Sequence, residues 1–414
     1  MLTKEQVCLV IGASHAGVNV GFALRKEGWS GRIVLFDADP NLPYHRPPLS
    51  KTFLSSESGI AQFLLKPAES YKKEQIELRL NTRVSRINKE EQNILLDDGS
   101  IISYDKLVIA TGARPFIPPI EGLKNAQNAF PLRTAQDVFN IRISLQNSPN
   151  KKVVIIGGGY IGLEIAASLK KLGSQVTILE REERILARVT APEMSAFFDD
   201  LHRRHGIQIH TQKHVTLIIQ SNGLNVVQCG DGSQFEAEVL IIGAGIRLNT
   251  EPAESAGLNI ENGIRVDEVA RTSDKNIFAI GDITYHFNPH YGRYIRLESV
   301  QNAVDQAKVA AAGICGKQPV YDAIPWFWSD QYDVKLQIVG LSDGYDQLLI
   351  RNEEDTDKFS VWYFKDNQLL AVDAVNNAKA YVLGAKLIKE KRPLNLENLL
   401  DSSVPLKMET LLLG

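Results

Sequence analysis

Two glycine-rich stretches of this chain have the residue types and the spacing that hold a pyrophosphate. They read GASHAG at 12–17 and GGGYIG at 157–162, and each joins an apolar run to a stretch with helical spacing. Glycines permit a tight turn and let the backbone approach a phosphate, which the N-terminus of the following helix attracts. The chain therefore predicts two dinucleotide sites where one loop would predict one.

An acidic residue follows each glycine loop at the end of the next predicted strand. Asp37, with Asp39 two residues later, follows the strand at 32–36, and Glu180 follows the strand at 175–179. A carboxylate there accepts from ribose hydroxyls, and Glu180 would repel a 2′-phosphate, which favours NADH over NADPH. The pattern leaves Asp37 and Asp39 open for the first site. Arg181 and Arg184, which follow Glu180, are predicted to be solvated.

The elements that position these loops are written twice. A strand at 7–11 and a helix at 18–26 surround the first loop, and a strand at 153–156 and a helix ending at Leu172 surround the second. A hairpin-like stretch follows each unit, with Asp98 fourteen residues before Gly112 and Asp231 fourteen residues before Gly245. This repetition predicts an α/β protein with a duplicated Rossmann-like fold. Ser14 replaces the middle glycine of the first loop and is small enough for the close approach.

Composition narrows the class of protein further. A length of 414 residues allows two or three domains, and a net charge of −3 argues against a dedicated nucleic-acid binder. No apolar run is long enough for a membrane span. The three cysteines form no CxxC pair, and the first strand, predicted from about Gln6, leaves no room for a signal peptide. We therefore expect a protein of the reducing cytoplasm.

Further motifs cover essentially the whole chain. They are PYHRPPLSK at 43–51, ATGARP at 110–115, RVTAPEMSAFF at 188–198, TSDKNIFAIGDI at 272–283, LESVQNA at 297–303, PWFWSDQY at 325–332 and SVPLK at 403–407. With these motifs the chain resembles the FAD-dependent NADH:ferredoxin reductases that serve bacterial oxygenase systems. One departure is Leu248, which stands where the family usually has proline.

The resemblance implies a glutathione-reductase-like architecture of two tandem Rossmann-like dinucleotide-binding domains and a smaller α+β C-terminal domain. The FAD-binding domain would comprise 1–112 and 247–322, with the NADH-binding domain at 113–246 inserted between them. Residues 323–414 would form the C-terminal interface domain. The implied cofactors are FAD and NADH.

The resemblance also implies the site residues. Lys51 and Glu164 would be catalytic and would meet beside the flavin N5, where hydride arrives from the nicotinamide. Trp328 would lie beside the isoalloxazine on the face toward the ferredoxin, while Trp326 fits a core position. Cofactor contacts are expected from Gly12, Ser14, Ala16, Gly17, Asp37, Asp39, Arg46, Lys51, Val84, Thr111, Gly112, Arg133, Gly157, Gly159, Tyr160, Ile161, Gly162, Glu180, Gly245, Gly281, Asp282 and Val300.

Four of these contacts have particular roles in the resemblance. Asp282 would accept from a ribityl hydroxyl, and Val84 and Arg133 would lie on the adenine side. Val300 would begin a helix whose N-terminal N–H groups face the pyrimidine edge of the flavin and stabilise negative charge there.

The segment PPLSKTFL contains no cysteine, although disulfide reductases of this fold carry their dithiol there. Flavin accepts two electrons as hydride and releases them singly, so the chemistry favours a [2Fe–2S] ferredoxin as the partner. Such a ferredoxin is usually acidic, so a basic face is expected near the flavin. Its candidates are Lys308, Lys386, Lys389, Lys391 and Arg392.

Several alternatives stay open. The ferredoxin would supply a cytochrome P-450 monooxygenase, with a Rieske dioxygenase or a rubredoxin system as alternatives of the same class. An NADH-sensing flavoprotein resembling apoptosis-inducing factor is an alternative of a different class. The resemblance suggests a monomer or weak homodimer. His202 and His205 lack further ligands, so no metal site is expected, and Cys8 fits a core position.

Overall fold

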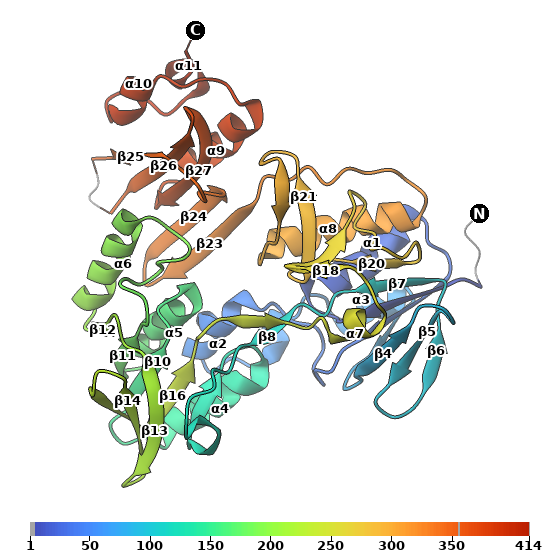
Figure 1. The fold of residues 1–414 in the computed structure, drawn as a ribbon, viewed down its shortest axis with the longest axis horizontal. Helices are drawn as coiled ribbons and strands as arrows, with labels where there is room; N and C mark the ends of the chain where they lie inside the picture. Colours follow the sequence, from blue (N-terminus) through green and yellow to red (C-terminus); the bar gives the residue numbers. More distant parts are fainter. Residues whose placement is uncertain (1–4, 355–356, 414) are drawn as a thin grey trace.

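The computed structural model describes residues 5–354 and 357–413. Figure 1 shows three parts: one in blue and orange beside the N-terminus, one in green, and one in red at the C-terminus. The orange segments follow the green ones in sequence but lie with the blue ones, so the green part is an insertion within the first.

Two parallel five-stranded sheets form the centres of the first two parts, and they have the same strand order. The first sheet runs β20(Ile277–Ala279)-β7(Lys106–Ile109)-β1(Val7–Ile11)-β2(Arg32–Phe36)-β3(Ile76–Arg79). The second runs β9(Ala129–Pro131)-β16(Val239–Ile242)-β10(Lys152–Ile156)-β11(Gln175–Leu179)-β12(Gln208–His210). Position by position the two orders correspond, which confirms the predicted duplication.

Each sheet is accompanied by a small three-stranded antiparallel sheet, where the sequence predicted a hairpin-like stretch. The first consists of β4(Val84–Asn88), β5(Asn93–Leu96) and β6(Ile101–Ser103). The second consists of β13(Val215–Ser221), β14(Leu224–Cys229) and β15(Gln234–Ala237). Asp98 and Asp231 each accept a hydrogen bond from the backbone N–H two residues later, so the turns also correspond.

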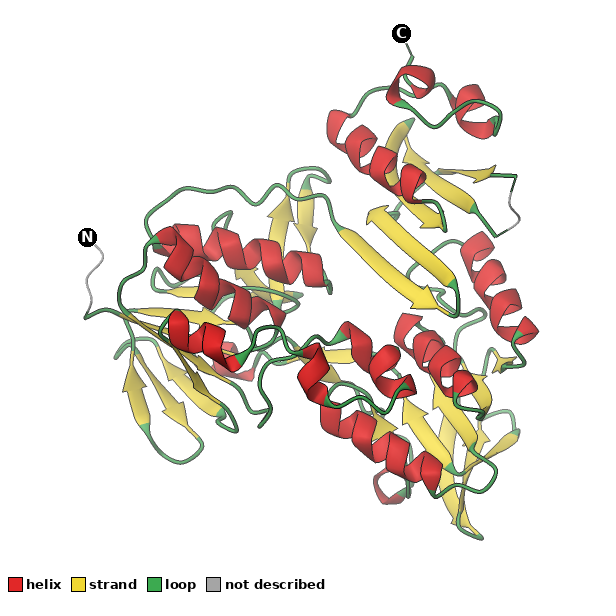
Figure 2. Ribbon diagram, turned by 180° about the vertical axis from the view of Figure 1, so that it is seen from behind, coloured by secondary structure: helices red, strands yellow, loops and turns green. Residues whose placement is uncertain are grey.

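Helices follow the strands that carry the glycine loops. α1(His15–Glu27) begins three residues before the predicted start, because Ser14 is its N-cap and the last glycine of the loop already lies in its first turn. α5(Tyr160–Lys171) starts in the same way after Gly159. In the first part α1 packs against α8(Val300–Ile314), which begins at the predicted residue, and Figure 2 shows these two long helices side by side.

The remaining helices of these two parts are shorter or lie farther from the loops. They are α2(Thr52–Ser55), α3(Ala68–Lys73), α4(Ala135–Gln146), α6(Pro192–Arg204) and α7(Glu251–Ser255). A further sheet of the first part contains β18(Ile260–Glu261), β19(Gly263–Val266), β21(Thr284–Asn288) and β22(Arg293–Ile295).

The chain enters and leaves the second part through one antiparallel pair of strands. β8(Ala113–Pro115) pairs with β17(Ile246–Leu248), so that Ala113 lies opposite Leu248. The predicted boundary at 112/113 falls directly before β8, and the predicted boundary at 246/247 falls within β17, after its first residue.

The C-terminal part is an antiparallel sheet covered by helices, as the predicted α+β domain requires. Its strand order is β23(Trp326–Gln331)-β24(Val334–Gly340)-β27(Gln368–Val375)-β26(Phe359–Lys365)-β25(Gln347–Asn352). The helices are α9(Ala378–Glu390), α10(Leu396–Leu400) and α11(Met408–Leu411), and α9 packs on β24 and β27.

A single apolar core joins the C-terminal sheet to the second part. Buried residues of β10, α5 and α6 belong to the same cluster as Leu336, Val361 and Ala371. Within this interface the buried carboxylate of Asp373 accepts from Thr190 Oγ1 and Tyr363 Oη, both at 2.7 Å. No helix of the described residues is long and apolar enough to cross a membrane.

Candidate active site

The two glycine loops have the same geometry. Gly12 has φ +102° and Gly157 has φ +114°, and a Cβ added to either would lie 2.3 Å from the carbonyl oxygen of Ala110 or Gly243. Both positions therefore require glycine. A Cβ added to Gly159 meets nothing within 4 Å, which explains why Ser14 is tolerated at the corresponding position of the first loop.

Both helix N-termini lack the groups that would otherwise satisfy them. Neither α1 nor α5 has a side-chain cap or an acidic residue in its first turn. Uncapped N–H groups and the positive end of the helix dipole are suited to a phosphate. The loops and helices thus fit the pyrophosphates of two dinucleotides.

The acid at the end of the second strand makes equivalent contacts in both units. Asp37 accepts from the N–H of Ala13 at 2.7 Å and from that of Asp39 at 2.9 Å. Glu180 accepts from the N–H of Gly158 at 2.6 Å and from that of Glu182 at 2.8 Å. Asp37 therefore occupies the place of Glu180.

Asp39 has different partners. Its carboxylate accepts from the Tyr44 hydroxyl at 2.6 Å and from the backbone and side chain of Asn41. The sequence left these two acids open, because spacing alone cannot show which one reaches the loop. The position equivalent to Glu180 belongs to Asp37.

Lys51 and Glu164 come together from different parts of the chain. Lys51 lies between the 3-10 turn η1(Pro47–Ser50) and α2, and its Nζ is 2.7 Å from Glu164 Oε2. Glu164 is only 2% exposed. Its carboxylate also accepts from Ser50 Oγ and Ser329 Oγ, each at 2.6 Å. Glu164 is thus a buried carboxylate that meets three donors, the Lys51 ammonium and two serine hydroxyls.

A second group of predicted cofactor residues meets beyond the first loop. Arg133 Nη2 lies 3.8 Å from Asp282 Oδ2, and Arg46 donates to the carbonyl oxygen of Arg133 at 2.7 Å. Burial raises the pKa of Asp282 to about 6, while the guanidinium of Arg133 lowers it. A Cβ on Gly112 would lie 3.7 Å from Arg133 Nη2, so Gly112 also borders this group.

Gly281 and Val300 are placed near the first loop by α8. A Cβ on Gly281 would lie 3.2 Å from the Cβ of Ala16, and the Gly281 N–H donates to Gln306 of α8. Val300 is the first residue of this helix, and Ser299 caps it by accepting from the N–H of Asn302.

Three other predicted contacts are placed differently. Val84 is 7% exposed and packs in the core with Leu96, so only its backbone is available to a ligand. Thr111 Oγ1 donates to the carbonyl oxygen of Asn249, across the β8–β17 connection. Gly245 ends this connection and has φ +107° with open space around an added Cβ.

The aromatic residues of β23 divide between its two faces. The Phe327 ring contacts Tyr160 at 5.1 Å between centroids. Trp326 and Trp328 contact each other at 5.5 Å, and both line a shallow hollow with Tyr381 and Asp330. Lys335 and Gln337 complete this hollow. Trp328 is the residue after Phe327, so its side chain points to the face of β23 opposite Tyr160.

Tyr160 has an unusual environment. Its hydroxyl is buried and has no hydrogen-bond partner in the described structure. Burial raises its pKa well above the ordinary value, and the carboxylates of Asp373 and Glu164 act in the same direction. Tyr160 is the first residue of α5, and the two carboxylates that act on its hydroxyl belong to α5 and to β27. An unsatisfied buried hydroxyl there fits a site that closes around a ligand.

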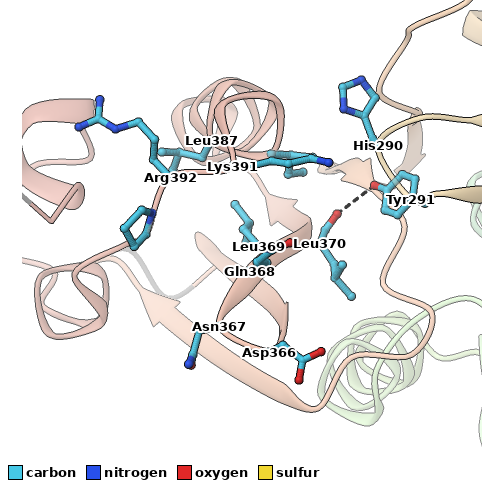
Figure 3. A pocket seen from close by; sticks show the side chains of 12 residues that line it. His290, Tyr291, Asp366, Asn367, Gln368, Leu369, Leu370, Leu387, Lys391 and Arg392 are labelled. Atoms are coloured by element: carbon cyan, nitrogen blue, oxygen red, sulfur yellow. Dashed lines mark hydrogen bonds between the residues drawn. The ribbon is translucent and has the colours of Figure 1, made fainter.

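The predicted basic residues do not form one surface. Lys391 and Arg392 line a pocket of about 240 Å³ between the β21–β22 hairpin and the C-terminal part, together with His290, Tyr291 and Leu370 (Figure 3). Lys308 is exposed and pairs with Asp305. None of the residues that line this pocket belongs to the predicted site.

Arg181 and Arg184, which follow Glu180, differ in exposure and in partners. Arg181 is exposed and pairs with Glu182, as predicted. Arg184 was expected to be solvated, and this is wrong: it is partly buried and donates to Ser195 Oγ and the carbonyl oxygen of Ala187. These partners are contributed by the following loop and α6, and local spacing does not predict them.

His202 and His205 both contact Tyr332, and His202 has a further partner in Gln331. His202 is buried against Gln331, whereas His205 stacks on Tyr332 at 3.6 Å between ring centroids. Cys8 is buried in β1, as predicted, and burial raises the pKa of its thiol to about 12. Among the described residues no cluster of histidine, cysteine or acidic side chains is arranged to hold a metal ion.

Comparison with known proteins agrees with this geometry. The family model of the pyridine nucleotide-disulphide oxidoreductases matches residues 6–307, and the model of the reductase C-terminal domain matches residues 326–410. The chain is 41% identical over 404 residues to putidaredoxin reductase of Pseudomonas putida, covering 96% of this chain and 95% of that protein.

Two further matches extend over almost the whole chain. The ferredoxin–NAD(+) reductase component of the anthranilate 1,2-dioxygenase system of Burkholderia cepacia is 36% identical over 402 residues, covering 96% of this chain and 98% of that one. The crystal structure of the covalent putidaredoxin reductase–putidaredoxin complex matches with a TM-score of 0.92, 40% identity and 98% coverage of each chain.

Proposed function

This chain belongs to the pyridine nucleotide-disulphide oxidoreductase family, and we propose that it is the NADH:ferredoxin reductase of a cytochrome P-450 monooxygenase system. It is a flavoprotein oxidoreductase that uses FAD and NAD(P)H, and the predicted resemblance to ferredoxin reductases of oxygenase systems is confirmed. The preference for NADH, the ferredoxin and the monooxygenase are the proposed parts.

The observation that carries this proposal is the Lys51–Glu164 pair on a segment without thiols. Cys8 and Cys229 are buried and Cys315 is half-buried, and none of the three lies in the segment that holds Lys51. Burial raises the pKa of each thiol, so none is activated as a nucleophile. Electrons therefore leave without passing through a dithiol, which suits a one-electron acceptor such as a [2Fe–2S] ferredoxin.

FAD, when bound, accepts hydride from the nicotinamide and releases the electrons singly. The first glycine loop and α1 would hold its pyrophosphate, and Asp37 would accept from its adenosine ribose. Asp282 would accept from a ribityl hydroxyl, and the N-terminus of α8 would face the flavin ring. The Lys51 ammonium would stabilise added negative charge beside the ring, and Glu164 keeps that ammonium in place.

The second loop would hold NADH in the same manner. Glu180 would accept from the adenosine ribose, and its carboxylate would repel a 2′-phosphate. Tyr160 of α5 and Phe327 of β23 contact each other beside this loop. Their rings would exclude water from the reacting faces of the nicotinamide and the flavin.

The hollow lined by Trp326, Trp328 and Tyr381 is the proposed ferredoxin surface. Aromatic side chains of this kind are typical of protein interfaces, and exposed Lys335 supplies positive charge for an acidic partner. Lys391 and Arg392 lie at the other pocket, so we leave them outside this surface.

The segments at 188–198 and 325–332 favour the monooxygenase system. The 36% identity to the anthranilate dioxygenase reductase keeps a Rieske dioxygenase as the second candidate. Three free thiols suit the reducing cytoplasm as the compartment.

An anaerobic titration of the holoenzyme tests the proposal. We expect NADH to bleach the flavin absorbance rapidly and NADPH to bleach it slowly. Addition of an oxidised [2Fe–2S] ferredoxin should then restore the yellow colour. A reduced complex that persists in the presence of ferredoxin would favour an NADH-sensing role instead.

A further inference from the structure

A buried chain of hydrogen bonds leads away from Glu164 on the side opposite Lys51. Ser329 Oγ donates to Glu164 Oε1 at 2.6 Å, and Gln331 Nε2 donates to Ser329 Oγ at 3.1 Å. Gln331 Oε1 lies 2.8 Å from His202 Nε2. The chain thus joins the catalytic pair to α6 through one face of β23.

The position of these side chains follows from the local structure. Ser329 and Gln331 are two residues apart on β23, so they point to the same face. His202 lies in the third turn of α6, on the side of the helix that faces this strand. Ser329, Gln331 and His202 each have 0% exposure. Burying three polar side chains costs free energy unless their polar groups are hydrogen-bonded, and here they bond to one another. Apolar residues would fill the same space without that cost, so we look for a role of these polar groups at Glu164.

The donors and acceptors of this hydrogen-bond chain all point the same way, from His202 toward Glu164. An amide oxygen only accepts, so His202 Nε2 carries the proton that it donates to Gln331. Burial lowers the pKa of His202 to about 4, which agrees with a neutral ring bearing a single N–H. Tyr332 Oη is 3.3 Å from Nδ1, the nitrogen that accepts. The amide group of Gln331 then presents its N–H to Ser329, and the serine proton points to Glu164.

The reverse orientation of the Gln331 amide would change the hydrogen bonding of Glu164. Gln331 would then accept from Ser329, and the one hydroxyl proton of Ser329 could not also reach Glu164. Glu164 Oε1 would lose a donor, and a proton on the carboxyl would be needed to fill the contact. The titratable groups that face Glu164 are Lys51, with which it pairs, and Tyr160, whose hydroxyl has no partner in the described structure.

We propose that Ser329, Gln331 and His202 are positioning residues that hold Glu164 as a carboxylate directed at Lys51, and thereby hold the Lys51 ammonium at the site of hydride transfer. This inference rests on the proposed role of the Lys51–Glu164 pair. It gives His202 a function that its spacing from His205 does not suggest.

The experiment uses holoenzyme with three test variants, one conservative variant, one control variant and one double variant. Ser329→Ala removes the donor to Glu164, Gln331→Met keeps the length of the side chain without its polar atoms, and His202→Phe keeps a ring without its N–H. His202→Gln is the conservative variant, because its amide nitrogen can replace Nε2. The matched control is His205→Phe, which keeps the stack on Tyr332 and removes no hydrogen bond among Ser329, Gln331 and His202.

Three functional readouts and one measurement of folding are taken for every variant. Stopped-flow absorbance gives the rate of flavin reduction by NADH, and potentiometry gives the midpoint potential of the flavin. Isotope-edited infrared spectroscopy at neutral pH reports whether Glu164 is ionised. Thermal unfolding shows whether each variant is folded.

Ser329→Ala, Gln331→Met and His202→Phe should each slow flavin reduction by about fivefold, the effect of one hydrogen bond. The KM for NADH should stay unchanged, and the infrared band of ionised Glu164 should weaken. Because the residues act in series, Ser329→Ala combined with His202→Phe should be no slower than Ser329→Ala alone. His202→Gln should recover most of the rate, and His205→Phe should equal the unmodified enzyme.

The inference is overturned if the three variants unfold at lower temperature but keep the rate, the potential and the ionised Glu164. It is also overturned if the double variant shows the product of the single effects. Glu164→Gln separates this result from failure of the proposed function. If Glu164→Gln itself leaves flavin reduction unchanged, the role of the ion pair fails, whereas the infrared band still decides whether the chain controls Glu164.

Discussion

Lys51 Nζ lies 2.7 Å from Glu164 Oε2, although 113 positions separate the two residues and Glu164 is almost fully buried. Two serine hydroxyls bind the same carboxylate, so the ammonium meets an acceptor that is already fixed. The ion pair joins the segment at 47–55 to α5. It is therefore both a contact between two parts of the chain and the centre of the proposed site.

Lys51→Met should leave a buried carboxylate without its counter-ion and lower the free energy of unfolding by about 3 kcal/mol. It should also slow flavin reduction by at least tenfold. Adding Glu164→Gln should restore much of the stability, because the unpaired charge is gone, but should not restore the rate. Urea unfolding and stopped-flow absorbance measure the two effects. Equal losses of stability in the single and the double variant would show that the pair is not coupled.

Glu180→Gln should weaken the choice between the two nicotinamide cofactors. The amide oxygen can still accept from one of the two backbone N–H groups, that of Gly158 or that of Glu182, while the charge that repels a 2′-phosphate is lost. We expect the ratio of kcat/KM for NADH to that for NADPH to fall by about tenfold, mainly through KM. Arg181→Gln is the control, since this exposed side chain pairs with Glu182 and makes no hydrogen bond to Glu180 or Gly158 in the described structure. An unchanged ratio would show that another group makes the choice.

Gly12→Ala and Gly157→Ala should separate the two sites. Each new Cβ would fall 2.3 Å from a backbone oxygen at a left-handed φ, so both loops must shift. Gly12→Ala should yield protein with little bound flavin. Gly157→Ala should remain yellow and be reduced by dithionite, but slowly by NADH. Flavin content by absorbance and the two reductions are the measurements, and loss of flavin from both variants would contradict the assignment of the loops.

Lys335→Glu should impair the step after flavin reduction. Reversing an exposed charge beside Trp328 should slow ferredoxin reduction by about tenfold at low salt, and the difference should shrink as salt rises. The rate of flavin reduction by NADH should not change. Lys391→Glu makes the same charge change at the other pocket and should leave both rates unaltered. A larger effect from Lys391→Glu would move the docking surface to that pocket.

Asp373 should make stability depend on pH. Burial raises its pKa to about 6, above the value of about 3.9 expected in the unfolded chain. Between these values the folded state keeps a proton that the unfolded state has lost. The free energy of unfolding therefore falls as pH rises from about 4 to 6 and stays reduced above that range.

Asp373→Asn should remove this slope and raise the free energy of unfolding at pH 7 by about 2 kcal/mol. Urea unfolding at several pH values measures it. Tyr363→Phe, which removes one donor to Asp373 at 2.7 Å, should shift the slope to higher pH. A slope that persists in Asp373→Asn would assign it to another group.

Much of the fold could be predicted from local pattern. The strand at 32–36, the strand at 175–179 and the start of α8 at Val300 agree with the structure, because apolar runs and glycine turns are encoded within a few residues. The predicted start of α1 is three residues later than the observed one, since Ala16 and Gly17 do not indicate a helix by their residue types. Lys51 and Glu164 could be brought together only through resemblance, because no local rule relates them.

The supporting residues of the site could not be predicted in this way. Ser329 and Gln331 follow Trp328 on a strand, yet their partners lie 165 and 129 positions away. The spacing of His202 and His205 indicates neither Tyr332, which both rings contact, nor the hydrogen bond between His202 and Gln331. Such contacts depend on how the C-terminal sheet sits against α5 and α6, which is fixed by the shared apolar core.

The β8–β17 pair suggests how such a chain could have arisen and how it could be altered. Because the two strands that lead into and out of the second part are hydrogen-bonded neighbours, a whole folding unit can be inserted there without separating the surrounding strands. The first sheet is already complete, since β7 pairs directly with β20 across the insertion. Gene duplication followed by insertion would leave this arrangement. The same pair offers laboratory recombination a junction at which one cofactor-binding unit can be exchanged for another as a cassette.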